Sequence, residues 1–148
     1  MTMAEEAQTL DADLSAIIAC LDVCTCFHDL LFYHRQERPD QIALIDEVAE
    51  VTYAQLVARA ERLAARLVAH GLTPGDRIAL LAKNDVAFVD LMMAASMTGL
   101  VFVPLNFRLA QPEIDFIVQD SEAKLVFVGT GFLETARAAQ ANSEGCHR

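Results

Sequence analysis

Apolar residues change their spacing several times through the middle of the chain, and each change marks an expected element. In the stretch 53–70, leucine and alanine recur at helical spacing with arginines between them, which predicts an amphipathic helix. The run 78–82 is wholly apolar, as expected of a strand buried on both faces of a sheet. A helix over 86–98 and a strand over 101–103 follow, with Gly99 as the helix end. The pattern predicts a β-α-β unit.

Cap and stop residues stand where these elements should begin and end. Thr52 lies three residues before Gln55, which is the spacing of a capping box. Asn84 or Asp85 can cap the second helix with a side-chain oxygen. Pro104 is expected to close the strand that precedes it, because proline cannot donate to a sheet ladder.

Further elements flank this unit on both sides. Upstream, we expect a helix over 27–36 and a hairpin with strands at 42–45 and 50–52. Downstream, we expect a helix over 111–120, a strand over 125–128 and a fading helix from residue 136. The apolar strands recur about every 24 residues, which leaves room for helical crossovers. The predicted fold class is α/β, with a mostly parallel sheet and helices on both faces.

Composition divides the chain into three parts. Residues 1–26 form an acidic extension, expected to be poorly ordered or to hold a short helix. Residues 27–141 form a partial α/β domain, and 142–148 form a tail. The hydrophobic fraction of 54% exceeds the ~45–50% of ordinary globular domains. We therefore expect the chain to expose apolar surface and to associate.

The net charge of −10 is concentrated in the first third of the chain. Residues 1–50 hold 11 acids and two arginines, whereas residues 51–148 are nearly neutral. Nucleic acid and anionic membrane both require basic surface, so neither is expected as a partner. The first residues are acidic and contain no basic segment of the kind that opens a secretory signal. We expect a cytoplasmic protein with reduced cysteines.

The stretch 86–105 allows a second interpretation, since its length would cross a bilayer. Its one charge, Asp90, would cost roughly 2.5–3.5 kcal/mol at the centre of a membrane helix. Gly99 and Pro104 also interrupt its far end. A helix followed by a buried strand explains the same residues, and we expect no membrane insertion.

A cluster near residue 26 carries possible metal ligands. Cys24, Cys26 and His28 lie within five residues, and Cys20 precedes them. A structural zinc site usually adds a second ligand pair at a defined spacing, and the sequence lacks one. We expect no metal site.

The remaining motifs are weak signals for chemistry. Gly129 and Gly131 follow a strand, but Glu134 stands where a dinucleotide fingerprint requires glycine, so a plain turn is favoured. Asn106 and Arg108 come just after a strand, where α/β sheets place ligands, and are either ligand-side candidates or loop anchors. No catalytic dyad is indicated for the scattered residues His28, His34, His70, His147, Tyr53 and Ser96.

Several segments in order resemble AMP-forming acyl-CoA synthetases. RPDQIAL at 38–44 is similar to their Pro-Asp-x-x-Ala-Leu segment, and TYAQL at 52–56 to their Thr-Tyr-x-Glu-Leu helix start, with Gln55 in place of Glu. GDRIAL at 75–80 resembles their Gly-Asp-Arg-Val-Ala strand. GLVFVPLNFRL at 99–109 resembles their Gly-Ala-Val-x-Val-Pro-Leu-Asn-x-Arg-Leu segment. The resemblance covers about residues 27–130.

The resemblance implies a fold, and it implies which functional groups of the family lie outside this chain. It implies a partial N-terminal subdomain of an enzyme that activates a carboxylic acid with ATP and magnesium and passes the acyl group to coenzyme A. The family's phosphate loop, metal-binding acid, ribose-binding aspartate and catalytic lysine lie beyond the matched portion. We therefore expect no catalytic, cofactor-binding or metal-binding residues in this chain, no cofactor of its own, and no activity in isolation.

Two alternatives remain open beside this fragment of a fatty acid–CoA ligase. The chain could be a non-catalytic interaction module that pairs through its sheet edge, or a small protein anchored in a membrane by 86–105. The expected partner is the remainder of an acyl-CoA synthetase or a second copy of the chain.

Overall fold

The computed structural model describes residues 25–145, with side chains through residue 139. The predicted extension up to residue 24, including Cys20 and Cys24, lies outside the described residues, as do Cys146 and His147. The described elements are, in chain order, α2 (Phe27–Glu37), β1 (Ile42–Ile45), β2 (Glu50–Thr52), α3 (Tyr53–Ala69), β3 (Arg77–Leu81), α4 (Val86–Thr98), β4 (Val101–Leu105), α5 (Gln111–Ser121), β5 (Leu125–Val128) and α6 (Leu133–Gly145).

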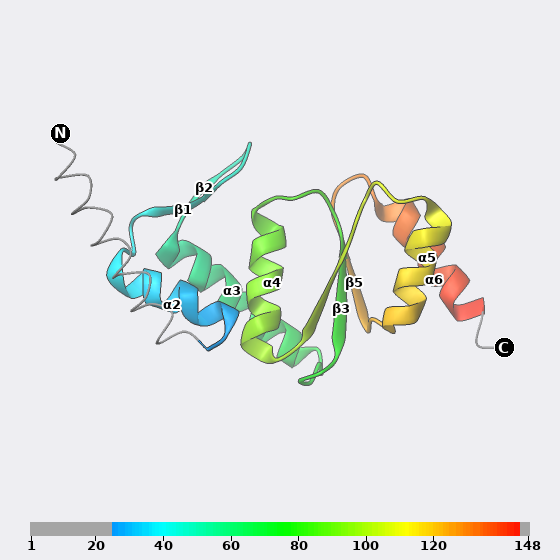
Figure 1. Ribbon diagram of the computed structural model, residues 1–148, viewed down its shortest axis with the longest axis horizontal. Coiled ribbons are helices and arrows are strands. Elements are labelled where there is room, and N and C mark those ends of the chain that lie inside the picture. The colour runs from blue at the N-terminus through cyan, green and yellow to red at the C-terminus, as the bar shows by residue number, and fades with distance from the viewer. Residues whose placement is uncertain (1–24, 146–148) are drawn as a thin grey trace, which may run out of the picture.

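A three-stranded parallel sheet forms the centre of the molecule (Figure 1). Its strand order is β4-β3-β5, and Ala79 of β3 lies opposite Val103 on one side and Val126 on the other. The parallel sheet predicted from the spacing of the apolar runs is confirmed. β1 and β2 pair separately as an antiparallel hairpin, also as predicted.

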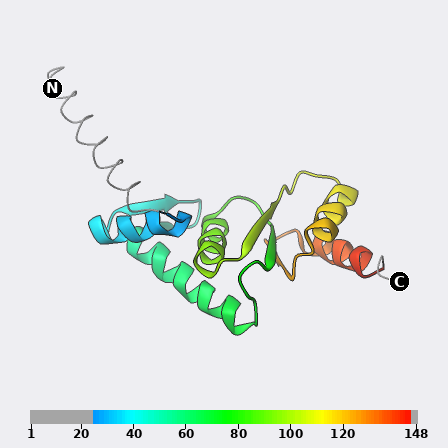
Figure 2. The ribbon, with the colours of Figure 1, turned by 60° about the horizontal axis from the view of Figure 1, so that its bottom comes forward.

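Helices cover both faces of the sheet. α3 and α4 lie on one side and α5 and α6 on the other (Figure 1). α3 runs along the outer side of α4, as Figure 2 shows. Only its C-terminal half reaches the sheet, where Ala64 and Leu67 share a buried cluster with Ile78 and Leu80. The expected packing of this helix on the sheet is thus confirmed for that half. Its N-terminal half packs with α2, the hairpin and α4.

Local sequence signals set the helix boundaries. The Thr52 hydroxyl accepts the Gln55 N–H at 3.3 Å, and the Gln55 side chain accepts the Thr52 N–H at 3.0 Å. Asp85 caps α4 by accepting the Phe88 N–H at 2.9 Å. Gly99 ends α4 with a φ of 69°. The unbroken membrane helix is therefore wrong for this stretch, and no helix in the described part of the chain is long and apolar enough to cross a membrane.

Two predicted boundaries are wrong, for physical reasons. β4 continues to Leu105 instead of stopping at Pro104, because the backbone at that proline faces away from β3 and no ladder bond is lost. α6 begins at Leu133 rather than residue 136, because Gly131, with a φ of 92°, turns the chain directly from strand into helix. α6 also continues to Gly145, past the expected start of the tail.

A partly buried ion pair, in which the carboxylate is buried and the guanidinium is half-exposed, fixes α3 against α4. Asp90 is only 6% exposed, and its Oδ2 accepts both Arg59 Nε at 2.9 Å and Arg59 Nη2 at 2.6 Å. The hydrogen bond to Asp90 is the main cause that raises the pKa of Arg59. Asp90 Oδ1 is buried without a hydrogen-bond partner. The carboxylate therefore depends on Arg59 for compensation of its charge.

At the amino-terminal edge of the sheet, Asp76 connects a turn to a neighbouring strand. Its Oδ2 accepts the Thr73 N–H at 2.8 Å, and its Oδ1 accepts Lys124 Nζ at 2.7 Å. The Lys124 hydrogen bond and the Thr73 N–H lower the pKa of Asp76 from 3.8 to about 2. The folded chain therefore favours the charged carboxylate, which links stability to pH.

We expect Arg59→Met to lower the free energy of unfolding by about 1–3 kcal/mol. Removing one partner leaves a buried charge uncompensated, at a cost of roughly 3–5 kcal/mol for a fully buried pair. The Arg59 side chain is 42% exposed, so water reduces that figure. Urea unfolding measures the change.

A double variant and a control separate charge from packing in that experiment. Arg59→Met with Asp90→Leu should recover most of the loss, because no charge remains buried. Arg62→Met, one turn further along the exposed side of α3, should change stability by no more than ~0.5 kcal/mol. A double variant as unstable as the single one would contradict this account.

Asp76 gives a prediction for acid. Its folded pKa of about 2 lies below the unfolded value of 3.8, so its contribution is present above pH 3.8 and is lost as the pH falls toward 2. Asp76→Asn should therefore lose less stability than the unaltered chain between pH 5 and pH 2, in urea unfolding at stepped pH. Glu37→Gln at the exposed end of α2 is the control and should follow the unaltered chain. Parallel curves for all three proteins would refute the assignment.

Candidate functional site

The carboxyl-terminal edge of the sheet is the place where an open α/β sheet binds its ligands. The loops that follow β3 and β5 leave toward opposite faces, because α4 and α6 lie on opposite sides of the sheet (Figure 1). Such a divergence between neighbouring strands makes a topological switch point. The loop after β4 leads to α5 on the same face as α6, so this divergence occurs on both sides of β3. The hollow lined by the ends of β3 and β5 makes the gap between these two strands the candidate site.

A hollow of about 200 Å³ lies at this point. Its walls are mostly apolar and include Leu80, Ala82 and Phe127. Gly129 lets the strand ends approach closely, since an added Cβ would lie 2.7 Å from the Ala82 Cβ. The acidic residues at its rim are Asp85, which caps α4, and Asp90, which holds Arg59. Both carboxylates therefore already serve the fold.

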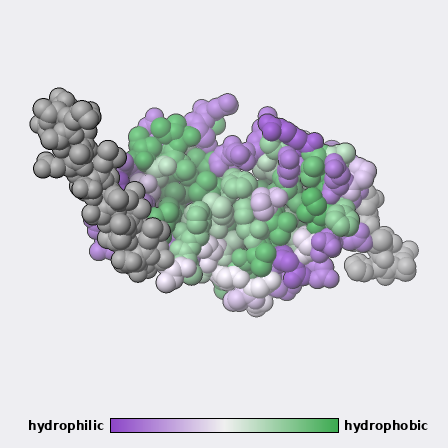
Figure 3. Space-filling view, in the orientation of Figure 1, coloured by the Kyte–Doolittle hydropathy of each residue, from purple (hydrophilic) through white to green (hydrophobic). Residues whose placement is uncertain are grey.

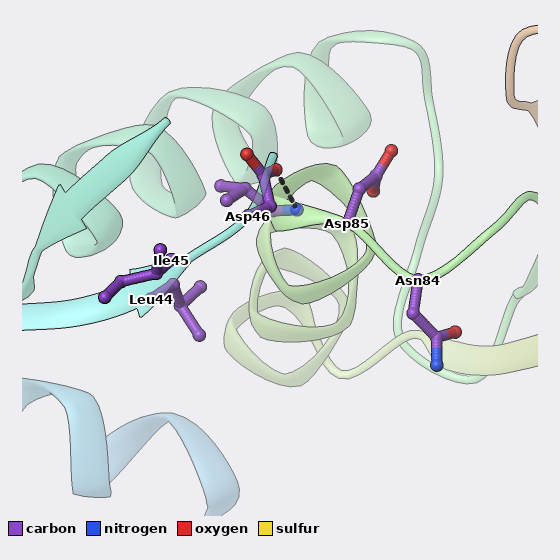
Figure 4. A pocket seen from close by; sticks show the side chains of 6 residues that line it. Leu44, Ile45, Asp46, Asn84 and Asp85 are labelled. Atoms are coloured by element: carbon purple, nitrogen blue, oxygen red, sulfur yellow. Dashed lines mark hydrogen bonds between the residues drawn. The ribbon is translucent and has the colours of Figure 1, made fainter. Parts of the chain in front are cut away.

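A second hollow of about 190 Å³ lies between the hairpin and the loop before α4 (Figure 4). Asp46 Oδ2 accepts the Val86 N–H across it at 3.1 Å, and Asp46 Oδ1 accepts the Val48 and Ala49 N–H groups. These three N–H groups lower the pKa of Asp46. The Asn84 side chain points away from Asp46 (Figure 4). Asp46 joins the hairpin to α4, and nothing here forms a reactive pair.

The ligand-side candidates after β4 serve to shape their loop. Asn106 Oδ1 accepts the Arg108 N–H at 3.0 Å, and the Arg108 guanidinium lies 5.2 Å from the Phe107 ring centroid. Neither residue lines the hollow between β3 and β5. These contacts fit the loop-anchor interpretation of Asn106 and Arg108.

The turn after β5 is occupied by its own hydrogen bonds. The Gly129 N–H donates to Leu81 O at 2.9 Å, and the Phe132 N–H donates to Gly129 O at 3.2 Å. A phosphate nest needs such N–H groups unbonded and convergent. The plain strand-to-helix turn favoured by the position of Glu134 is the arrangement found, with Glu134 in the first turn of α6.

Sequence reasoning missed one contact that resembles catalytic machinery. His28 Nδ1 lies 2.9 Å from Ser96 Oγ, and His28 Nε2 lies 3.7 Å from Asp29 Oδ1. His28 and Ser96 are 68 positions apart in the sequence, so no local pattern could have predicted their contact. Ser96 lies inside α4, where neighbouring N–H groups are committed to the helix and cannot form an oxyanion hole. The contact is a structural hydrogen bond between α2 and α4.

No cluster of three or more metal-ligating side chains occurs in the part of the chain that the structure describes. Cys26 is exposed next to the start of α2, and His28 is engaged with Ser96. Because Cys20 and Cys24 lie outside that part, the absence of a metal site stays a prediction.

Comparisons with known proteins identify the family. Residues 31–147 match the family described as AMP-binding enzyme. The long-chain-fatty-acid–CoA ligase FadD13 of Mycobacterium tuberculosis is 44% identical over 94 residues, which are 64% of this chain and 19% of the ligase. The fatty acid–[acyl-carrier-protein] ligase ScoC of Streptomyces coeruleorubidus is 38% identical over 68% of this chain and 19% of its own length. The chain thus spans about a fifth of the curated relatives it matches.

Solved structures agree with this result. The N-terminal domain of FACL13 from Mycobacterium tuberculosis superposes with a TM-score of 0.75 at 37% identity, over 80% of this chain and 30% of that one. A benzoate CoA ligase from Burkholderia xenovorans gives a TM-score of 0.75 at 27% identity, over 80% of this chain and 24% of that one. The chain belongs to the AMP-binding enzyme family and corresponds to an N-terminal portion of an adenylate-forming acyl-CoA synthetase.

Proposed function

We propose that this chain is a scaffold segment of a cytoplasmic, ATP-dependent ligase that activates a carboxylic acid such as a fatty acid, and that the segment alone forms no acyl-adenylate. The observation that carries the proposal lies at the carboxyl-terminal edge of the sheet. The sheet resembles that of the ligases, but the Gly129 N–H at this edge is already hydrogen-bonded within the fold. The edge has the fold's ligand-binding position without the groups that the reaction needs.

The nucleotide and magnesium that the family implies do not fit the described residues. Adenylation builds charge around the α-phosphate, which cations and free backbone N–H groups must stabilise. The Gly129 N–H is already bonded to Leu81 O, and Asp85 caps α4. Lys124 pairs with Asp76 at the opposite edge of the sheet, and Lys83 is exposed in the loop after β3. No step of the reaction can be assigned to these side chains.

In this proposal the remainder of a ligase supplies ATP, magnesium and coenzyme A binding, and the chain supplies packing. Its relatives are about five times longer, which leaves ample sequence for those functions. The apolar residues exposed on the described surface fit a segment that another part of a protein covers, and they include Ile45 at 69%, Val48 at 93% and Phe116 at 65%. Figure 3 shows apolar residues gathered in patches on one face.

A non-catalytic interaction module is the second candidate function. The observation in its favour is that both outer strands of the parallel sheet have an unpaired edge among the described residues. An unpaired edge offers a row of backbone donors and acceptors to another strand. This function does not require a catalytic site.

We expect no acid-dependent ATP–pyrophosphate exchange from the isolated chain with short, medium and long acids. Removal of a single stabilising donor costs ~10²–10³ in rate, so a site lacking all of them should fall to the no-acid blank. The Mycobacterium tuberculosis ligase FadD13 is the positive control. Exchange that Lys83→Ala or Lys124→Ala abolishes would refute the proposed inactivity.

A chimera tests the scaffold role directly. Replacing the matched 94 residues of FadD13 with the corresponding segment of this chain should retain exchange, because the two segments are 44% identical. The same chimera with Ala79→Asp places a charge at a position that is 0% exposed, and it should neither fold nor catalyse. A folded but inactive chimera without that substitution would contradict the proposal.

A further inference from the structure

Three arginines of α3 surround one hollow on the surface of the described structure. The hollow has a volume of about 230 Å³ and is lined by Arg59, Arg62, Leu63, Arg66 and Asp90. Residues three and four positions apart lie on the same face of a helix, so the arginine side chains are neighbours. This face of α3 therefore gathers positive charge on a chain whose net charge is −10.

The positive charge around this hollow is only partly compensated. Among the described residues of its lining, Asp90 is the one acid, and the ion pair with Arg59 already matches its charge. In the described part of the chain, neither Arg62 nor Arg66 has a hydrogen bond or an ion pair. Two guanidinium charges are therefore left without a counter-charge.

This arrangement costs the helix some stability. Like charges four residues apart on a helix repel each other, and Arg62 and Arg66 are such a pair. The helix dipole offsets the cost for Arg66, which lies in the last turn of α3, but not for Arg62. Glu61, an acid on the same helix, pairs with Arg35 at 3.0 Å instead. An anion bound between Arg62 and Arg66 would remove the repulsion.

Covering by the rest of a ligase does not account for these charges. Exposed apolar residues such as Val48 and Phe116 gain free energy when another part of a protein covers them. An arginine that is covered without an acid loses its water and becomes an uncompensated charge. Arg62 and Arg66 are both exposed, and their helix runs along the outer side of α4 (Figure 2). We therefore expect this hollow to stay open to solvent in a longer protein.

We propose that Arg62 and Arg66 bind the phosphate group of a soluble phosphate compound. A guanidinium presents a planar fork of N–H donors that matches two oxygens of a phosphate group. A phosphate monoester has three such oxygens and a charge of about −1.5 to −2 at neutral pH, which two arginines balance. A carboxylate has one charge and two oxygens, so a single guanidinium already satisfies it. The two free charges therefore favour phosphate.

The other residues around the hollow permit an anion to bind. Asp90 repels it weakly, because its Oδ2 is bonded to two nitrogens of Arg59 and its Oδ1 is buried. Arg62 and Arg66 do not line the hollow between β3 and β5, so the phosphate site is distinct from the candidate site at the sheet edge. It goes beyond the proposed scaffold role, since binding of phosphate involves no adenylation.

Modification of arginine by phenylglyoxal tests the site on the full chain, with mass spectrometry to locate the modified residues. Inorganic phosphate at about ten times its dissociation constant should slow the modification of Arg62 and Arg66 about tenfold, because the reagent reaches only the free site. Arg137, which pairs with Glu134 on α6, is the internal control and should react at an unchanged rate. Sodium acetate at the same ionic strength should protect neither arginine. Equal protection by acetate, or no protection by phosphate, overturns the proposal.

Two matched substitutions separate a phosphate site from general attraction between charges. Arg62→Gln removes one fork of donors and should weaken the binding of inorganic phosphate about tenfold or more. Arg137→Gln changes the net charge by the same amount but should leave binding within about twofold, because salt screens a distant charge. Both side chains are exposed, so both variants should fold. Equal weakening by the two variants would refute the site.

Vesicles distinguish a soluble phosphate compound from a lipid headgroup. The chain should not sediment with vesicles of phosphatidylcholine and phosphatidic acid in equal parts, because its net charge of −10 opposes approach to an anionic surface. Sedimentation with the vesicles that Arg62→Gln abolishes, without protection of Arg62 by inorganic phosphate, would overturn the assignment of a soluble ligand.

Discussion

Burial of β3 on both faces and along both edges is the constraint on which the rest of this structure depends. Ile78, Ala79 and Leu81 are fully buried, so every backbone group of the strand must find a partner within the protein. β4 and β5 satisfy those groups, and the helices on the two faces cover the side chains. Each connecting helix must therefore cross the sheet, which gives the alternation of strand and helix along the chain.

The same constraint concentrates polar residues at the ends of the strands. At the amino-terminal edge, Asp76 and Lys124 form a pair that joins a turn to β5. At the carboxyl-terminal edge, Asp85 serves as a helix cap and the Gly129 N–H completes the ladder with β3. Polar groups that are committed to the fold in this way cannot also stabilise a transferring phosphate. This commitment is the physical reason for proposing a scaffold role for the segment.

In an outer strand of the sheet, the backbone groups of alternate residues face the central strand or point away from it. Pro104 is acceptable in β4 because its backbone faces away from β3. β5, the other outer strand, pairs only with β3 among the described residues, and its four residues are partly buried.

The sequence by itself determined the elements whose signals are local. The capping box of Thr52 and Gln55, the Asp85 cap and the left-handed Gly99 depend on residues within one turn of a helix, so their spacing can be read directly. The parallel sheet was predictable because wholly apolar strands are typical of sheets covered on both faces, and the spacing of these strands leaves room for helical crossovers. Only the tertiary structure decided which distant residues meet. Nothing near Asp90 indicates Arg59 as its partner, and His28 meets Ser96 only because α2 packs on α4. Those contacts depend on how whole helices pack, which no local pattern encodes.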